Sequence, residues 1–231
     1  MIARIKERAE VAKGTLQVTF DLAPATVSFK AGQFFTLTLP NPPYTDERGN
    51  RRFFSIANSP NQNDMFVIAT RVRDTAFKRS LREMPLGSDV EIGPIAGRLV
   101  LPADLSRPLA FIAGGIGIVP FISMIRWAAE EHLPANITLL YANRNREVAA
   151  YLDELGATPG LRLITTMDGD PAWPGEKRII TAQFIKDYVA DPQACRWMIA
   201  GPPGMSEALS AALQEAGVDK HNIQIERFIG Y

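Results

Sequence analysis

The chain has 231 residues, of which 46% are hydrophobic and 22% charged, the balance of a globular protein that buries one or two cores. Its formal net charge of zero gives no support for nonspecific binding to nucleic acid, so no nucleic-acid partner is expected. Cys195 is the only cysteine, which excludes an intrachain disulfide and a cysteine-ligated iron–sulfur cluster within the chain. His132 and His221 lack short-spaced metal-ligand partners, so no metal is expected.

The first residues, MIARIKERAEVAKG, carry scattered charges with neither an apolar block nor a small-residue cleavage site, so we expect a cytoplasmic protein. Residues 1–104 carry 14 Lys and Arg against 11 Asp and Glu, whereas the later residues carry 11 against 14. So small an asymmetry is typical of a solvated surface. It has meaning for function only if the basic residues of the first part gather around one site, namely Arg48, Arg51, Arg52, Lys78, Arg79 and Arg82.

Up to about Leu101 the chain is typical of short strands, because β-branched and aromatic residues gather in brief segments between turn-forming stretches such as NPPYTDERGN and NSPNQND. The predicted strands are Thr15–Leu22, Gln33–Leu39, Met65–Val72 and Val90–Ile92. This pattern predicts an antiparallel barrel.

Within this half, Arg52, Phe54 and Ser55 form the pattern Arg-x-aromatic-Ser. An arginine can hold a phosphate by two parallel contacts, an aromatic ring can cover a planar heterocycle, and a hydroxyl can hydrogen-bond a ring nitrogen. A flavin nucleotide requires all three. A strand with an exposed arginine and a core aromatic residue would give the same short pattern.

A short helix is predicted within Arg73–Leu81, with Asp74 or Thr75 as its N-cap. Its first N–H groups, around Ala76 to Lys78, would make a second contact with a diphosphate, and Lys78 would add positive charge. The alternative is a capped surface helix without a ligand.

From Leu109 onward, apolar strands alternate with helical stretches, which predicts a parallel sheet with crossover helices. The strands are Leu109–Ala113, Ile137–Tyr141, Leu161–Thr165 and Trp197–Ala200, and the helices are Pro120–His132, Glu147–Leu155, Thr181–Ala190 and Met205–Ala216. The stretch PADLSRP looks like a linker. We therefore predict a barrel domain over residues 1–104 and an α/β domain over residues 105–231.

The segment AFIAGGIGIVPFISM contains a turn between two apolar runs, formed by Gly114, Gly115, Gly117 and Pro120. A buried strand that turns sharply into a helix directs free backbone N–H groups at one point, where a nucleotide diphosphate fits. The uncharged run from Arg107 to Arg126 is near the lower length limit of a membrane span. Three glycines and a proline at its centre favour strand, turn and helix, and no membrane span is expected.

A second strand ends in a glycine–proline turn within AGPPGMSEAL, Ala200–Leu209. The carboxyl ends of parallel strands line the crevice where ligands bind, so this turn and the Gly114 turn would face the same ligand. A plain strand–helix connection would look the same.

Taken in order, RFFS at 52–55, GGIGIVPF at 114–121, GPPGM at 201–205 and ERFIGY at 226–231 resemble the motifs of the ferredoxin-NADP reductase family along nearly the whole chain. The family joins a flavin-binding β-barrel to a nicotinamide-nucleotide-binding α/β domain. The resemblance implies a flavin-dependent oxidoreductase that transfers hydride between NADPH or NADH and bound FAD. Single electrons would pass to or from a carrier such as ferredoxin or flavodoxin, or a redox partner subunit.

Two alternatives stay open. One is an NAD(P)H-dependent reductase of free flavin or of a small oxidant. The other is a nucleotide-binding, reductase-like subunit with little turnover, because Ala200 and Ile116 stand where relatives have cysteine and threonine near the reacting nicotinamide.

The resemblance also implies roles for single residues. Ser55 would bond the flavin nitrogen that receives hydride, and the terminal Tyr231 would stack on the flavin and move aside for nicotinamide. Glu226 would stabilise charge near the flavin or simply end a strand. The flavin-binding residues implied are Arg52, Phe53, Phe54, Ser55, Ala69, Thr70, Arg71, Ala76, Phe77 and Lys78. Those implied for the nicotinamide nucleotide are Gly114, Gly115, Ile116, Gly117, Ile118, Gly201, Pro202, Pro203 and Met205.

The second flavin-phosphate motif departs from the family, because Thr75 and Lys78 stand where relatives have glycine and serine. The sequence contains features that favour NADPH and features that oppose it. A pocket for a 2′-phosphate would draw on Thr165, Thr166, Lys177 and Arg178, whereas the nearby Asp168 and Asp170 would repel that phosphate. The sequence slightly favours NADPH.

Overall fold

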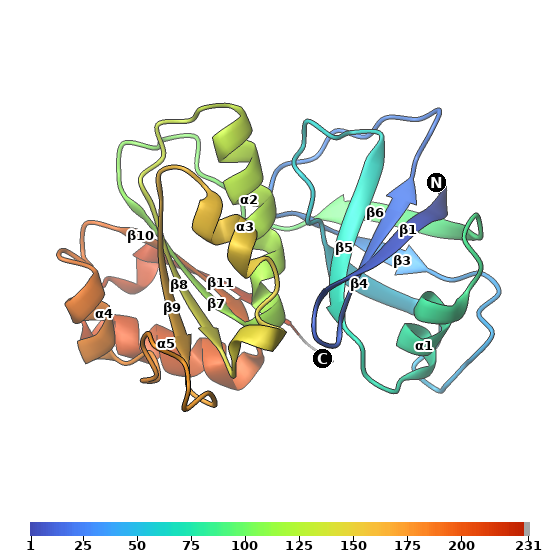
Figure 1. Ribbon diagram of the computed structural model, residues 1–231. Coiled ribbons are helices and arrows are strands. Elements are labelled where there is room, and N and C mark those ends of the chain that lie inside the picture. The colour runs from blue at the N-terminus through green and yellow to red at the C-terminus, as the bar shows by residue number, and fades with distance from the viewer. Residues whose placement is uncertain (229–231) are drawn as a thin grey trace.

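The computed structural model describes residues 1–228, and Tyr231 with its implied stacking role lies outside the described residues. Two units stand side by side in Figure 1, one built on a six-stranded antiparallel sheet and the other on a five-stranded parallel sheet with helices. The predicted fold class, an antiparallel barrel followed by an α/β unit, is confirmed.

The first unit is a strongly curved antiparallel sheet with the strand order β4-β3-β6-β1-β2-β5. Its elements are β1 (Ile2–Ala12), β2 (Thr15–Asp21), β3 (Phe34–Thr38), β4 (Arg51–Ser55), β5 (Met65–Arg71), α1 (Ala76–Glu83) and β6 (Asp89–Ala96). The two edges of the sheet lie close together. Ala57 N, just after β4, donates a hydrogen bond to Val67 O of β5 at 2.8 Å. Phe35 and Phe66 stack inside at 4.8 Å between ring centroids, so the sheet encloses an aromatic core.

The strand β1 is absent from the sequence-based prediction. Its inward residues Ala3 and Ile5 are buried, whereas Ile2, Arg4 and Lys6 between them are exposed. The alternation is short, because a register shift between Ile5 and Glu7 breaks it and Lys6 and Glu7 are both exposed, so the period-two pattern does not extend along the strand. The other addition, β4, carries the Arg-x-aromatic-Ser pattern.

The second unit is a parallel sheet with the order β11-β10-β7-β8-β9. Its elements are β7 (Leu109–Gly114), η1 (Gly115–Gly117), α2 (Ile118–Glu130), β8 (Ile137–Asn143), η2 (Arg146–Val148), α3 (Leu152–Ala157), β9 (Leu161–Met167), α4 (Ala182–Tyr188), β10 (Arg196–Gly201), α5 (Pro203–Glu215), η3 (Lys220–Asn222) and β11 (Ile223–Arg227). The central strand β7 is buried throughout. Ala110 and Ile112 pack with α4 and α5, whereas Phe111 and Ala113 pack with α2 and α3.

Element boundaries shift by a few residues from those predicted. The helix expected from Pro120 begins at Ile118, and the one expected from Met205 begins at Pro203. The helix expected over Glu147–Leu155 divides into η2 and α3, because Tyr151 adopts a left-handed backbone conformation with φ of 60°.

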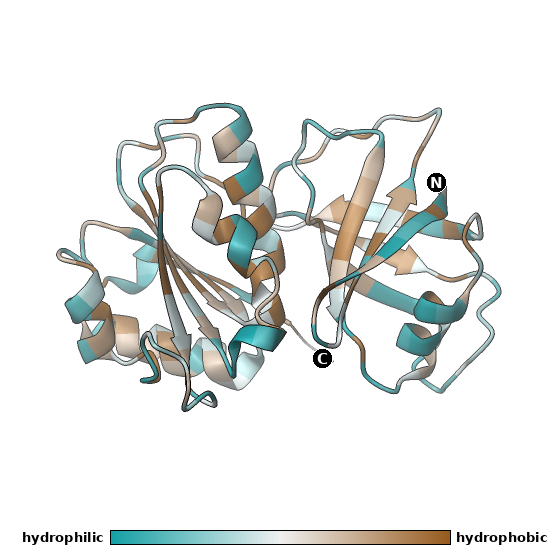
Figure 2. Cartoon of the chain, viewed as in Figure 1, coloured by the Kyte–Doolittle hydropathy of each residue, from teal (hydrophilic) through white to brown (hydrophobic). Residues whose placement is uncertain are grey.

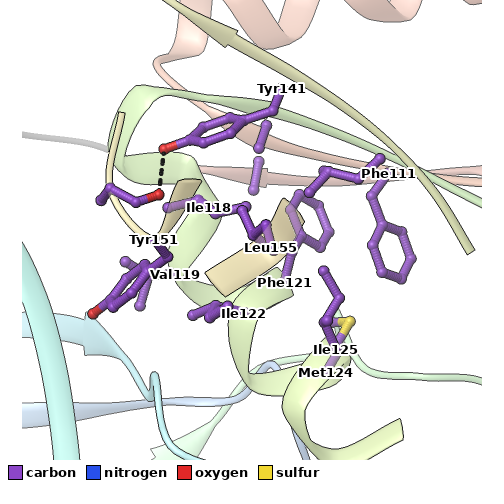
Figure 3. Close-up of a cluster of buried hydrophobic side chains, with 14 of the residues drawn as sticks. Phe111, Ile118, Val119, Phe121, Ile122, Met124, Ile125, Tyr141, Tyr151 and Leu155 are labelled. Carbon is purple, nitrogen blue, oxygen red and sulfur yellow. Dashed lines mark hydrogen bonds between the residues drawn. The ribbon is translucent and has the colours of Figure 1, made fainter. Parts of the chain in front are cut away.

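The helix α2 lies between the parallel sheet and the barrel in Figure 1. Its apolar side chains form the cluster of Figure 3, where Phe111 stacks on Phe121 at 4.7 Å and Tyr141 Oη donates to Ala150 O at 3.1 Å. The same core includes the barrel residues Ala57 and Ala69. Several hydrogen bonds tie the units together, among them Arg126 Nη1 to Ala57 O at 2.8 Å, Ser123 Oγ to Asn58 O at 2.7 Å, and Tyr151 Oη to Gln17 Oε1 at 2.8 Å.

The connection between the units, residues 97–108, contains neither helix nor strand, and we propose the domain boundary at residues 104 and 105 within it. The apolar run after Arg107 forms β7, η1 and α2, so the prediction of strand, turn and helix is confirmed. Figure 2 shows it as a hydrophobic region in the interior, whereas α1 is largely hydrophilic. None of the helices in residues 1–228 has the length and apolar character needed to cross a membrane.

Candidate functional site

A cavity of about 480 Å³ opens where β4, the start of α1 and the end of β11 meet. It is lined by five aromatic residues, five cationic residues, two hydroxyl residues and one carboxylate, namely Phe34, Phe53, Phe54, Phe77, Phe228, Arg48, Arg51, Arg52, Lys78, Arg227, Ser55, Thr75 and Glu226. A volume of this size suits a cofactor. Cations beside aromatic rings suit a ligand that combines phosphate with a planar ring system.

Arg52 is held at the cavity wall by its own loop. Its Nη1 donates to the carbonyl oxygens of Arg48, Gly49 and Arg51 at 2.8, 3.1 and 2.7 Å. Its guanidinium also lies 5.1 Å from the centroid of the Phe77 ring. These contacts preorganise a positive charge beside the cavity.

The aromatic residues of β4 face two directions. Phe54 is buried and stacks on Phe77 at 5.9 Å, so these two rings form one wall of the cavity. Phe53 is 64% exposed and meets Phe34 edge to face at 5.7 Å. The structure therefore separates an aromatic wall from an exposed ring at the cavity mouth.

Ser55 and Glu226 join the two units. Ser55 Oγ donates to Glu226 Oε1 at 2.9 Å across a separation of 171 residues. Burial raises the pKa of Glu226 to about 7, although the Ser55 hydrogen bond acts in the opposite direction. The Glu226 carboxyl can therefore take up or release a proton near neutral pH.

The start of α1 places Lys78 in the same cavity. Thr75, and not Asp74, is the N-cap, and its Oγ1 accepts from Lys78 N at 3.4 Å. One of the N–H groups expected to face a diphosphate is therefore occupied by the cap. Lys78 is only 7% exposed. Burial lowers the pKa of its amine to about 8, and the positive charges of Arg73 and Arg52 act in the same direction.

The six basic residues singled out in the first part divide into two groups. Four of them line the cavity: Arg48, Arg51, Arg52 and Lys78. Arg79 instead lies over the Tyr44 ring at 3.9 Å, and Arg82 pairs with Glu83 at 2.7 Å. Only four of these six basic residues therefore contribute positive charge to the cavity.

The glycine turn after β7 is fixed by close backbone contacts. Gly115 has φ of +52°, a conformation that side-chain-bearing residues rarely adopt. A Cβ atom at Gly117 would overlap the Ala200 carbonyl, and one at Gly114 would overlap the Met205 sulfur. Glycine is required at Gly117, where backbone atoms stand in the way, whereas a side chain at Gly114 would require the Met205 side chain to move.

The two predicted nucleotide turns are brought together. Gly114 and Gly201 end the adjacent parallel strands β7 and β10, and the Met205 side chain packs over both. The N-cap Pro202 and the following Pro203 begin α5 at this edge. Ile116 and Ile118 are buried beneath the turn. Two helices thus start beside one another, which is the geometry that binds a diphosphate.

The cavity and the glycine turns adjoin each other. In the parallel register, Glu226 lies opposite Ala200, and Phe228 N donates to Gly201 O at 3.1 Å. Arg71 of the barrel is also close to this turn, because its Nη2 lies 3.6 Å from the position that a Cβ atom would take on Gly115. A ring held by the first unit and a nucleotide held by the second would therefore meet here.

Not every implied residue reaches the cavity. Ala69 and Thr70 of β5 are buried in the sheet, and within residues 1–228 Thr70 Oγ1 has no hydrogen-bond partner. Sequence reasoning missed Phe34, Arg227 and Phe228 as lining residues. Arg227 and Phe228 follow Glu226 directly, which was an available signal, whereas Phe34 is placed only by its pairing with Ser55 across β3 and β4.

The basic residues after β9 are engaged in local contacts. Arg178 pairs with Glu176 at 2.6 Å and with Asp187 at 2.8 Å. Lys177 Nζ donates to Pro171 O at 2.6 Å. Asp168 is exposed at the carboxyl edge of the sheet. This arrangement opposes the slight preference for NADPH expected from the sequence.

Comparisons with known proteins agree with this geometry. The family described as Oxidoreductase NAD-binding domain matches residues 111–211. Ferredoxin–NADP reductase B of Sorangium cellulosum is 28% identical over 213 residues, which cover 87% of this chain and 85% of that protein. Phenoxybenzoate dioxygenase subunit beta of Ectopseudomonas oleovorans is 33% identical over 218 residues, which cover 90% of this chain.

The chain spans 61% of that dioxygenase subunit and 53% of a flavohemoprotein of Rhodopirellula baltica. Among solved structures, a ferredoxin NADP⁺ reductase from Neisseria gonorrhoeae with bound FAD and NADP superposes with a TM-score of 0.82 at 20% identity, covering 98% of each chain. Residues 111–211 thus match the Oxidoreductase NAD-binding domain, and along most of its length the chain is similar to FAD- and NAD(P)-binding oxidoreductases of the ferredoxin-NADP reductase family.

Proposed function

We propose that the chain is an NAD(P)H-dependent flavoprotein reductase, which moves hydride between a nicotinamide nucleotide and bound FAD and single electrons to or from a separate carrier. The observation that carries the proposal is the Ser55–Glu226 hydrogen bond, because it joins the aromatic, cationic cavity to the strand beside the glycine turns. When bound, FAD would supply the conversion between two-electron and one-electron transfer.

The cavity residues fit that cofactor. Arg52, Lys78 and the start of α1 would hold its diphosphate, because they bring positive charge to one wall. Phe54 and Phe77 would support its ring system, and Ser55 would contact the ring edge.

Glu226 and Ser55 would manage the proton. A hydride brings two electrons, and two single electrons then leave, so one proton is released for each nucleotide oxidised. The Glu226 carboxyl, with its pKa near 7, would hold that proton and exchange it through the Ser55 hydroxyl. A carboxyl with an ordinary pKa would stay ionised at neutral pH and could not do so.

NADH is the preferred nucleotide in this proposal. Lys177 and Arg178 already have local partners, so a 2′-phosphate would have to compete with Glu176 and Asp187 for the Arg178 guanidinium. The exposed Asp168 would repel that phosphate and can accept a hydrogen bond from a ribose hydroxyl.

The electron carrier would present an acidic surface. Arg48, Arg51 and Arg227 are exposed around the cavity, and the exposed ring of Phe53 lies among them. Such a rim steers an acidic protein toward the cofactor and gives it an apolar contact.

Visible spectroscopy of the purified chain, followed by anaerobic titration with NADH and then NADPH, tests the proposal. We expect a flavin spectrum that bleaches at lower concentrations of NADH than of NADPH. Turnover with an acidic carrier protein, compared with free flavin, then separates carrier reduction from free-flavin reduction. A colourless protein that also fails to bind added FAD would refute the proposed function.

A further inference from the structure

The helix α2 connects the two parts of the candidate site. It begins directly after the glycine turn η1, and it lies between the parallel sheet and the barrel in Figure 1. The barrel segment that it meets, residues 57–59, follows β4 shortly after Ser55. Any movement of α2 relative to this segment would therefore change the distance between the cavity and the glycine turn.

Side chains from successive turns of α2 bind segment 57–59. Ser123 Oγ donates to Asn58 O at 2.7 Å, and Arg126 Nη1 donates to Ala57 O at 2.8 Å. The α2 side chains with hydrogen bonds to this segment are Ser123, Arg126 and Glu130. Their spacing places them on one side of the helix, so that side of α2 is fixed to the barrel.

Arg126 is held in one orientation by α3. Its Nε and Nη2 donate to the two carboxylate oxygens of Glu154 at 2.7 and 2.8 Å. Its guanidinium also lies over the Tyr151 ring, 5.0 Å from the ring centroid. Only 23% of the Arg126 side chain is exposed. Because a guanidinium paired through two donors has a fixed direction, its third contact, with Ala57 O, is directed as well.

Tyr151 has a strained backbone conformation at the same interface. Its φ of 60° and ψ of 16° are left-handed, a conformation that a residue with a side chain keeps only where surrounding contacts fix it. Besides the contact with Arg126, Tyr151 Oη donates to Gln17 Oε1 of β2 at 2.8 Å. Figure 3 shows this hydroxyl pointing away from the rings of Phe111 and Phe121. The strain is therefore located where the second unit meets the barrel.

We propose that Arg126 is a positioning residue for the reaction. By fixing α2 to the segment that follows Ser55, it sets the distance between a flavin ring in the cavity and a nicotinamide held at the glycine turn. The inference rests on the proposed function, because it assumes that both ligands bind at these places. Hydride transfer needs reacting atoms about 3 to 3.5 Å apart, and a misplacement of about 1 Å slows such a reaction about 100-fold. Arg126 itself is not among the described residues that line the cavity.

The substitution that tests this role is Arg126→Met, which leaves Ala57 O without its donor. Stopped-flow absorbance over a series of NADH concentrations gives the limiting rate of flavin reduction and the Kd for NADH separately. We expect the limiting rate to fall about tenfold, while the Kd values for NADH and for FAD stay within about twofold of the parent's. Arg126→Lys keeps the charge but loses the fork of donors, so its rate should be intermediate.

A second measurement does not depend on turnover. Ala57 N donates to Val67 O, so amide hydrogen exchange at Ala57 reports how firmly segment 57–59 is held. In the chain without FAD, we expect this exchange to be about tenfold faster in Arg126→Met than in the parent.

Two control variants separate Arg126 from other charged residues. Arg146→Met is the matched change, because Arg146 is exposed and its Nη2 pairs at 2.6 Å with Asp153 of the same unit. Lys13→Met removes an exposed ion pair that does join the units, with Glu147 at 2.7 Å. Both variants should keep the parent's limiting rate and the parent's exchange at Ala57, since exposed ion pairs contribute little energy.

Thermal unfolding of each variant verifies folding. If Arg126→Met does not fold, Arg126→Lys and Ser123→Ala carry the test. Ser123→Ala removes one hydrogen bond from the same side of α2 and should lower the limiting rate about threefold.

Different results overturn different statements. A parent chain that binds no FAD, or whose bound FAD is reduced by neither NADH nor NADPH, overturns the proposed function and this inference with it. A parent that is reduced, with the same limiting rate as Arg126→Met, Arg126→Lys and Ser123→Ala, overturns the inference alone. So does an Arg126→Met protein with a weakened Kd for NADH and an unchanged limiting rate, because Arg126 would then act in binding.

Discussion

The two units contribute to the candidate site in different ways. The barrel half uses side chains, with Arg52, Lys78, Phe54 and Ser55 lining a cavity. The α/β half uses backbone, with glycine turns that end β7 and β10. Side chains around a cavity can change in charge while the fold persists, whereas a turn in which a Cβ would strike a carbonyl tolerates glycine alone.

The strongest test of this difference is Gly117→Ala. The new Cβ would overlap the Ala200 carbonyl and displace the turn from the strand beside Glu226. We expect the rate of flavin reduction by NADH to fall about 100-fold, while the flavin spectrum is kept. Stopped-flow absorbance measures the rate.

Gly156→Ala is the matched control for that substitution. It lies in α3, outside both glycine turns, and a Cβ there would meet no atom within 4 Å. Its reduction rate should equal that of the parent, with slightly higher helix stability. Equal rates for both alanine variants would show that backbone contact at Gly117 is unimportant.

Removing the charge of Arg52 is the corresponding change in the barrel half. Arg52→Met deletes a preorganised cation and also the three hydrogen bonds to its loop. The Kd for FAD should rise about tenfold or more. Arg52→Lys keeps the charge but not the fork of donors, and an intermediate Kd in equilibrium dialysis would show that both matter.

Glu226→Gln tests the contact between the halves. The raised pKa of Glu226 means that its carboxyl is protonated below about pH 7 and ionised above it. The parent's rate of electron delivery should therefore change through that pH, whereas the glutamine protein should lack this titration. We expect its rate at neutral pH to be about tenfold lower. An unchanged pH–rate profile in the variant would exclude Glu226 as the proton carrier.

The smallest expected effect concerns the nucleotide. Asp168→Asn removes a negative charge at the exposed carboxyl edge of β9, where solvent screens it. The ratio of kcat/KM for NADPH to that for NADH should rise only about threefold, because a single exposed charge has little energy. Arg162→Gln, an exposed change elsewhere on β9, should leave the ratio unchanged. A parent that already prefers NADPH would contradict the proposal.

Some elements could be predicted because their signal is local. The apolar run with glycines after Leu109 predicts a buried strand followed by a sharp turn, and the helix predicted from Thr181 is present as α4, with Thr181 as its N-cap. β1 was missed because register shifts interrupt its alternation after Ile5, and β11 lies in a short segment without a strong pattern. The division of the helix after Asn145 depends on Tyr151, whose left-handed backbone no local rule predicts.

The two-part architecture and the residue types that a flavin and a nucleotide need can be read from the amino-acid order, because hydrophobic period and glycine turns act within a few residues. Which of these residues share a site depends on how the strands and helices pack. This packing joined Ser55 to Glu226 and placed Met205 over Gly114, but it directed Arg79 and Arg178 to other partners. The reason is physical: proximity across many residues, and the burial that shifts the pKa of Lys78 and of Glu226, arise only when the strands and helices pack.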